Sequence, residues 1–388
     1  MAQQSSTNPA SQTNLGRING GTNALNNRDL YLKLFSGEMF KGFQHETIAR
    51  DLVMKRTLKN GKSLQFIYTG RTKAEYHTPG NSILGNDQKA PPVAEKTITC
   101  DDLLISSAFV YELDETLAHY ELRGEISKKI GYALAQKYDR MIFRSITRGA
   151  RKDSPVSMTN YEEPGGTQIQ VGGGSDADDA YSATHLITAF YDAAAALDEK
   201  GVSTQGRVGV LNPRQYYALI QEVGSNGLIN RDETGTALQS GQGIVEIAGI
   251  KIYKSMNIPF FSKYGTKYAP SSGASASTDL ATVDPGNTGD FVSESIETGT
   301  AATGNNYGVR NNYGASTAFA NSCGLIFQKE AAGIVEAIGP QVQVTSGDVS
   351  VVYQGDVILG RLAMGSDYLN PAAAVELFAG TSTKPTAF

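Results

Sequence analysis

The clearest pattern of apolar positions is helical and runs through DETLAHYELRGEISKKIGYALAQKYDRMIFRSITRGARK, residues 114–152. Apolar residues recur there at intervals of three and four, the spacing of one helix face: Ile126, Ile130, Leu134, Tyr138 and Met141. Asp114 or Thr116 suits the helix start, and the cations of 144–152 favour the negative end of the helix dipole. We predict one rod of roughly 50 Å, with its apolar face on a sheet.

The segment KSLQFIYTG, residues 62–70, is predicted to be a strand, because Leu64, Phe66 and Tyr68 occupy every second position, as residues on one face of a strand do. Gly61-Lys62-Ser63 resembles the end of a phosphate-binding loop. That loop needs a glycine where Arg56 stands, and a helix after its lysine. Asn60-Gly61 between two apolar runs is instead typical of a hairpin turn. We therefore predict a hairpin here and no nucleotide site.

The chain then stays polar and rich in Gly and Pro up to Pro92, and strand text returns at KTITCDDLLISSAFVYELDE, residues 96–115. Loops this long usually have a function. The two flanking strands predict a two-stranded finger, with about a dozen residues on each side and a reach of roughly 40 Å. A finger this thin has no core of its own, so we expect it to lie on a neighbouring subunit.

The remaining text predicts an α/β layer with additions at both ends. Residues 1–28 are polar and cannot form a core, whereas residues 30–53 read as an amphipathic helical arm. The other expected elements are a Gly-rich joint (162–179), helices (180–202 and 212–223), strands (207–211, 249–261 and from 319 onward) and a polar surface insertion (262–316). Helices and strands in this order indicate an α+β protein.

Charge is distributed unevenly along the 388 residues. Residues 1–155 carry 22 Lys and Arg against 16 Asp and Glu, a net charge of +6. Residues 156–388 carry 12 against 23, a net charge of −11, and the two sum to the −5 of the whole chain. A basic front half and an acidic back half suit head-to-tail contact between identical copies. Composition drift without a function is the alternative.

Candidate chemistry is sparse. Cys100 and Cys323 fit no metal or disulfide spacing, and we expect both to be small buried hydrophobes. The acids of GSDADD, residues 174–179, lack the Gly and Glu of a calcium loop and fit the start of a helix better. The four histidines lie far apart in the sequence, and no nucleophile motif accompanies them. No apolar run reaches the length of a membrane span. We predict no enzyme, no cofactor, no metal site and no membrane segment.

Four separated blocks resemble one family in the right order: YLKLFSGEMFKGF, GKSLQFIYTGRTKAEYHTPG, HYELRGEISKKIGYALAQKYDR and LAMGSDYLNPAAAVEL. They are similar to the major capsid protein of T7-type short-tailed phages (podoviruses), which has the HK97 (Hong Kong 97) fold. The likeness covers about residues 29–260 and 319–380. Residues 1–28 and 262–316 depart from it.

The resemblance implies an α+β, HK97-like architecture with named parts. These are an N-terminal arm (1–50), an extended loop (51–105), a peripheral domain with a long spine helix (106–180), an axial domain (181–324) containing the insertion 262–316, the returning strands of the peripheral domain (325–363) and a closing strand to the axial domain (364–388).

The resemblance also implies a function and its residues. The chain would self-assemble through hexamers and pentamers into the icosahedral virion capsid around double-stranded DNA, which it would contact only loosely. Assembly would take place in the host bacterial cytoplasm, with a scaffolding protein and with a portal protein at one vertex. The extended loop would contact a neighbouring subunit through Lys62, Phe66, Tyr68, Arg71, Lys73, Glu75 and Tyr76. The alternatives are an encapsulin-like, non-viral compartment of the same fold and a hydrolase or binding protein that uses the Gly-rich joint.

Overall fold

The structure is a computed structural model. It describes residues 48–72, 74, 76–80, 93–100, 103–111, 122–154, 163–174, 178–221, 246–255, 257–258, 322–344 and 353–385. In chain order its elements are α3 (Ala49–Leu52), β1 (Met54–Thr57), β2 (Ser63–Thr69), β3 (Val93–Thr99), β4 (Leu103–Tyr111), α5 (Leu122–Ala150), β5 (Thr167–Gln170), η1 (Asp178–Tyr181), α6 (Ala183–Glu199), β6 (Arg207–Leu211), α7 (Pro213–Gln221), β7 (Glu246–Ile247), β8 (Ile250–Lys254), β9 (Ser322–Gln328), β10 (Ala332–Val344), β11 (Gly355–Tyr368), η4 (Pro371–Ala373) and β12 (Ala374–Phe378). The predicted arm up to Thr47 and the insertion 262–316 lie outside the described residues.

The chain divides into two compact units. The described part of unit 1 falls within residues 100–138 and 336–365. That of unit 2 falls within 48–99, 139–335 and 366–388. The divisions lie inside α5, β10 and β11, so these three elements contribute residues to both units.

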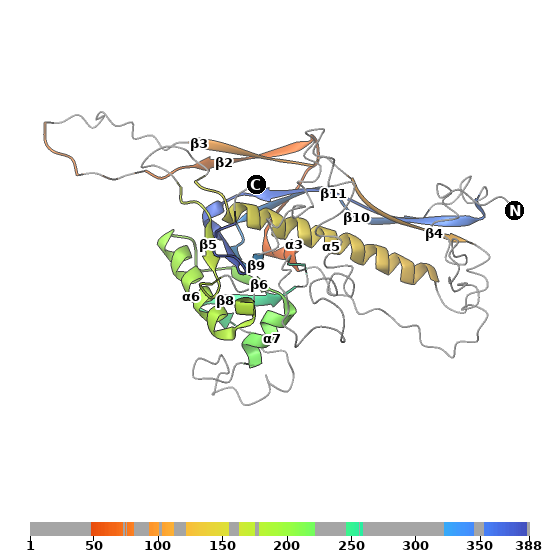
Figure 1. Ribbon diagram of the computed structural model, residues 1–388. Coiled ribbons are helices and arrows are strands. Elements are labelled where there is room, and N and C mark those ends of the chain that lie inside the picture. The colour runs from red at the N-terminus through yellow and green to blue at the C-terminus, as the bar shows by residue number, and fades with distance from the viewer. Residues whose placement is uncertain are drawn as a thin grey trace. The chain divides into compact units, whose positions relative to one another are not determined.

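In unit 1, the first half of α5 rests on strands. β4 and β11 pair antiparallel, from Tyr111 opposite Gly355 to Leu103 opposite Ala363. They belong to a four-stranded sheet in the order β1-β10-β11-β4. Figure 1 shows α5 as one uninterrupted helix. Its predicted apolar face meets the sheet, since the helix and strand residues form one buried cluster: Ile130, Leu134, Val110 and Ile358, with the half-buried Ile126 against it.

Gly360 allows this close approach of helix and sheet. A Cβ atom at that position would lie 2.4 Å from Ile130 Cγ2 and 2.9 Å from Leu134 Cδ1. The first distance is far shorter than real carbon contacts, so any larger residue at position 360 would push α5 away from the sheet.

Unit 2 is built on a six-stranded sheet in the order β5-β12-β9-β6-β8-β7. The pairs β5–β12 and β6–β8 are parallel, and the other pairs are antiparallel. Figure 1 shows α6 and α7 beside this sheet. α6 turns Leu186, Phe190 and Leu197 into the largest apolar cluster described, at the three-to-four spacing of a helix face. Phe190 lies directly over Gly209, where a Cβ atom would lie 2.8 Å from its ring.

The C-terminal end of α5 also contacts this sheet. Gly149 lies against Ala374 of β12, because an added Cβ atom would be 3.7 Å from that side chain. Arg151 and Glu376 form an ion pair with no exposed side-chain surface. Nearby, burial raises the pKa of the Cys323 thiol, which donates to Leu377 O at 3.3 Å. Cys323 is buried as predicted, whereas Cys100 is only half-buried.

The start of the described chain is anchored to α5. The backbone N–H groups of Ile48 and Ala49 donate to the two carboxylate oxygens of Asp139, at 3.1 and 3.2 Å. Burial raises the pKa of Asp139 to about 7, although these two bonds and one with the Asn257 side chain favour the charged form.

The predicted hairpin at Asn60-Gly61 is wrong. Gly61 does have the positive φ of a turn, +96°. However, β1 is a neighbour of β10, whereas β2 pairs with β3 in a separate two-stranded sheet. The turn therefore joins strands of two different sheets. A turn motif reports local backbone geometry and carries no information about which strands then pair.

Candidate intersubunit surface

The predicted finger is present as a two-stranded ribbon, β2 and β3, which pair antiparallel from Ser63 opposite Thr99 to Thr69 opposite Val93 (Figure 1). Each strand has seven residues, fewer than the dozen predicted. The described residues that follow β2, from 70 to 80, belong to no helix or strand.

Alternation gives the ribbon two different faces. On the inner face, Leu64 and Phe66 pack against a small cluster of buried residues of the same unit: Ile98, Val335 and Leu369. On the outer face, Ile67 is 74% exposed and Val93 is 64% exposed. The ribbon therefore presents large apolar side chains to water on the face turned away from its own unit.

Charged groups hold the inner face in place. Lys96 Nζ lies 2.9 Å from Asp367 Oδ2 and 3.7 Å from the centre of the Tyr368 ring. Arg148 approaches the same Asp367 at 3.6 Å. Burial raises the pKa of the Tyr68 hydroxyl, and the neighbouring Tyr368 and Asp367 raise it further. These contacts fix the root of the ribbon to β11.

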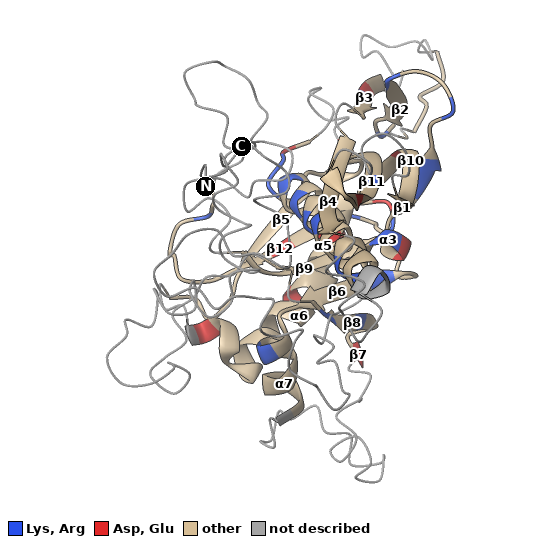
Figure 2. Ribbon diagram, turned by 90° about the vertical axis from the view of Figure 1, so that its right-hand side faces the viewer, with Lys and Arg blue, Asp and Glu red and all other residues tan. Residues whose placement is uncertain are grey.

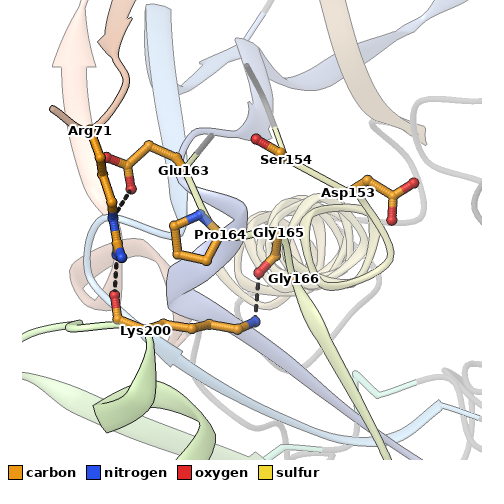
Figure 3. A pocket seen from close by; sticks show the side chains of 8 residues that line it. All are labelled: Arg71, Asp153, Ser154, Glu163, Pro164, Gly165, Gly166 and Lys200. Carbon is orange, nitrogen blue, oxygen red and sulfur yellow. Dashed lines mark hydrogen bonds and ion pairs between the residues drawn. The ribbon is translucent and has the colours of Figure 1, made fainter. Parts of the chain in front are cut away.

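Just beyond β2, Arg71 reaches two acceptors that are distant in the sequence. Its Nε lies 3.3 Å from Glu163 Oε2, and its Nη2 donates to Lys200 O at 2.5 Å (Figure 3). Lys200 is the C-cap of α6, whose last turn contains no basic residue. Arg71 therefore supplies a cation at the negative end of that helix.

These residues line an open pocket of about 590 Å³ formed by Arg71, Asp153, Ser154, Glu163, Pro164, Gly165, Gly166 and Lys200. Figure 3 shows the Lys200 side chain running along one side of it, with its amine against the glycines. That amine donates to Gly165 O at 2.5 Å and to the Thr167 hydroxyl. Burial lowers the pKa of Lys200 to about 8.

The extended-loop residues named from the sequence have different surroundings. Lys62 and Tyr76 are exposed, and Arg71 is half-exposed. Phe66 and Tyr68 are half-buried on the inner face of the ribbon. Lys73 and Glu75 lie outside the described residues.

The spine-helix residues are buried to different degrees. Ile130 and Leu134 share a cluster with the half-buried Ile126. Tyr138 is buried elsewhere, and its hydroxyl donates to Glu336 Oε1 at 2.6 Å. Met141 is half-buried.

Sequence reasoning missed the buried polar contacts. Arg151, assigned to the helix dipole, instead pairs with Glu376, 225 residues away. The tie between Asp139 and the chain start, and that between Arg71 and Glu163, also join distant segments. No local signal marks such pairs. Figure 2 shows Lys and Arg residues of α5 in blue.

Within the described ranges, no group of three or more His, Cys, Asp and Glu side chains is placed to hold a metal ion. His185 Nδ1, in α6, lies 3.2 Å from Asp179 Oδ1, in the short helix η1 that precedes α6. In the same part of the chain, no helix is long and apolar enough to cross a membrane.

Comparison with known proteins identifies the family. Residues 65–303, more than half of the chain, match the family described as "Gp10A-like: Major capsid protein". The chain is 31% identical to the major capsid protein of Escherichia phage T7 over 194 residues, 49% of this chain and 56% of the relative. The matched region thus spans about half the length of this curated relative.

Solved structures agree over nearly the whole chain. The capsid of cyanophage P-SCSP1u matches with a TM-score of 0.64 and 31% identity, over 94% of this chain and 97% of that one. The mature capsid of bacteriophage PhiM1 matches with a TM-score of 0.59 and 14% identity, over 89% and 91% of the two chains, and so supports the fold alone. The predicted HK97-type capsid fold is confirmed, and the chain belongs to the Gp10A-like family of phage major capsid proteins.

Proposed function

We propose that copies of this chain assemble through hexamers and pentamers into the icosahedral shell that encloses phage double-stranded DNA. Family membership supports a structural shell protein, and one observation in this chain carries the assembly mechanism. The β2–β3 ribbon exposes Ile67 and Val93 on its outer face. Large apolar side chains left exposed on one face of a ribbon are suited to a partner surface.

The partner surface that we propose is a second copy of the chain. Exposed apolar side chains at the centre of a contact supply most of its affinity, and charges at the rim fix its register. Ile67 and Val93 have the first role. Lys62 and Tyr76, both exposed, lie near the two ends of the β2 segment and belong to the rim. Phe66 and Tyr68 support the ribbon from inside, since they pack on their own unit.

The further partners follow from the family and are part of the same proposal. They are a scaffolding protein during assembly in the host cytoplasm, a portal protein at one vertex, and packaged DNA held loosely. The acidic balance of the chain, −5 overall, supports loose contact with DNA. The phage capsids among the similar structures favour a virion shell over an encapsulin-like compartment.

Electron microscopy of the purified chain, alone and with its scaffolding protein, tests the proposal. We expect closed shells of uniform size from the parent chain. Ile67→Lys with Val93→Lys should leave a folded, unassembled chain, because both changes lie on the outer face and remove no buried contact. Val342→Lys, the same change at an exposed valine of β10, is the matched control. Normal shells from the Ile67/Val93 variant would contradict the role given to the ribbon.

A further inference from the structure

The contact of Arg71 with Glu163 is weak enough for another arginine to take the place of Arg71. Arg71 is 50% exposed and Glu163 is 27% exposed, and one bond of 3.3 Å joins the two charged groups. Exposed ion pairs contribute little to stability, because water and salt screen the two charges. The other partner, Lys200 O, is a backbone acceptor at a helix end and accepts any guanidinium in the same place. An equivalent arginine from elsewhere therefore competes with Arg71 at little cost.

The pocket is larger than the side chain that now occupies its edge. Its volume of about 590 Å³ lies within the roughly 300–1,000 Å³ of ligand pockets. A guanidinium fills only a small part of that space. The pocket is thus open to a further side chain from outside.

The lining of the pocket favours a cation. Glu163 contributes a carboxylate, and Lys200 O contributes a carbonyl at the negative end of α6. Asp153 also lines the pocket, but its carboxylate points away from Arg71 and Lys200 (Figure 3). The Lys200 amine is the other cationic group of the lining besides Arg71, and it lies against the glycines, where Gly165 O and the Thr167 hydroxyl accept its hydrogen bonds (Figure 3). A planar guanidinium matches a carboxylate and a carbonyl better than an ammonium does.

We propose that this pocket is the receptor for Arg71 of a second copy, and that Arg71 of the same chain occupies it only until the shell assembles. Every copy carries both the arginine and the receptor, so the contact passes from within one chain to between chains by exchange of an identical element. Arg71 follows the ribbon in a segment without helix or strand, which is where such an exchange needs freedom. This inference rests on the proposed function and names the residue pair through which one extended loop engages the next subunit.

Charge reversal separates the two arrangements. Arg71→Glu and Glu163→Arg each place like charges together, which costs several kcal/mol at an interface. Each variant alone should yield at least about tenfold fewer shells than the parent. The double variant Arg71→Glu/Glu163→Arg re-forms the pair in either arrangement. Its shells show that the changes leave the fold intact.

The deciding sample is an equal mixture of the two single variants as unassembled chains. Within each chain the pair stays repulsive, whereas between unlike chains it is attractive. Alternating copies around a six-membered ring satisfy every contact, and a five-membered ring leaves one clash. We therefore expect the mixture to recover shells in part, each containing both variants by mass spectrometry.

Two results would overturn the exchange while leaving the proposed function intact: a mixture as defective as the single variants beside an assembling double variant, or single variants that assemble like the parent. A parent chain that forms no shells, alone or with its scaffolding protein, would overturn the proposed function and the exchange with it.

Discussion

At the scale of single residues, the main feature is a charged pair placed where no water reaches. Arg151 Nε and Nη2 donate to the two carboxylate oxygens of Glu376, at 2.7 and 2.5 Å. Gln168 Nε2 donates to the same carboxylate at 3.0 Å. Both charged side chains have no exposed surface. With its hydrogen bonds satisfied, the pair fixes the end of α5 on β12.

Breaking this pair should cost far more than its net contribution. Arg151→Met leaves the Glu376 carboxylate buried without its cation, and we expect a loss of about 3–5 kcal/mol in the free energy of unfolding. The double change Arg151→Met/Glu376→Leu should recover most of it. Urea unfolding of the unassembled chain, followed by circular dichroism, measures both.

Arg71→Met is the control for that experiment, since it breaks a half-exposed pair and should cost at most about 1 kcal/mol. Equal losses at the buried and the exposed arginine would contradict the argument. So would a double variant no more stable than Arg151→Met.

Asp139 predicts a pH dependence of stability. Burial raises its pKa to about 7 in the folded chain, from an ordinary value of 3.8, so the folded state holds the proton more tightly. Its contribution to stability is fully present below pH 3.8 and is lost as pH rises through about 7. The loss is about 1.4 kcal/mol for each pH unit within that window. Asp139→Asn removes the titration and keeps an acceptor for the N–H groups of Ile48 and Ala49.

The measurement is the difference in unfolding free energy between the parent and Asp139→Asn at pH 4.5, 6 and 7.5. We expect the variant to gain relative to the parent as pH rises. Parallel curves for the two chains would show that Asp139 does not titrate in this range. A variant that loses stability relative to the parent as pH rises would reverse the sign and refute the burial argument.

At the scale of elements, local patterns predicted well where neighbours in sequence determine the structure. The three-to-four spacing from Ile126 to Tyr138 predicted α5, and the alternation around Phe66 predicted β2. The predicted hairpin was wrong because the residues of a turn do not determine which strand each flanking strand pairs with. β1 lies beside β10, some 280 residues further on in the chain. The pairs Arg151–Glu376 and Arg71–Glu163 were not predicted for a similar reason, because the residues of each pair are far apart in the sequence.

The packing of α5 on its sheet gives a prediction at this scale. Gly360→Ala places a carbon 2.4 Å from Ile130 Cγ2, and overpacking of this kind costs about 1–3 kcal/mol. Ile130→Ala, which removes Cγ2, should therefore cost less stability in the Gly360→Ala background than in the parent chain. Thermal unfolding followed by circular dichroism measures the series.

Gly339→Ala in β10 is the matched control, since an added Cβ atom there meets nothing within 4 Å. It should leave stability unchanged or slightly raise it. If Gly360→Ala left the thermal stability equally unchanged, α5 would pack less closely on β11 than the distances to Ile130 and Leu134 indicate.

At the scale of the whole molecule, the fold type was predictable because four separated sequence blocks resemble one family in order. The use of its surfaces was predictable only in part. Sequence patterning pointed to a finger needing a partner, and our proposal places that partner on the face that exposes Ile67 and Val93. It did not distinguish Phe66, which packs on its own unit, from Ile67 beside it, because both are apolar residues of one strand.

The uneven charge of the two halves, +6 and −11, makes assembly a salt-dependent process if copies meet front to back. Screening shortens the reach of exposed charges from about 10 Å at 0.1 M salt to about 3 Å at 1 M. Steering by complementary charge then falls, and the rate of association falls with it. We expect light scattering to show slower shell formation as NaCl rises from about 0.05 to 0.5 M.

Buried apolar contacts do not weaken over that range, so shells already formed should persist when salt is added afterwards. The two measurements therefore separate the effect of long-range charge attraction on the rate of assembly from the effect of apolar contacts on the stability of the finished shell. Assembly that is equally fast at every salt concentration would favour composition drift as the origin of the charge difference. Shells that dissolve on adding salt would mean that the charges, rather than faces such as that of Ile67 and Val93, hold the copies together.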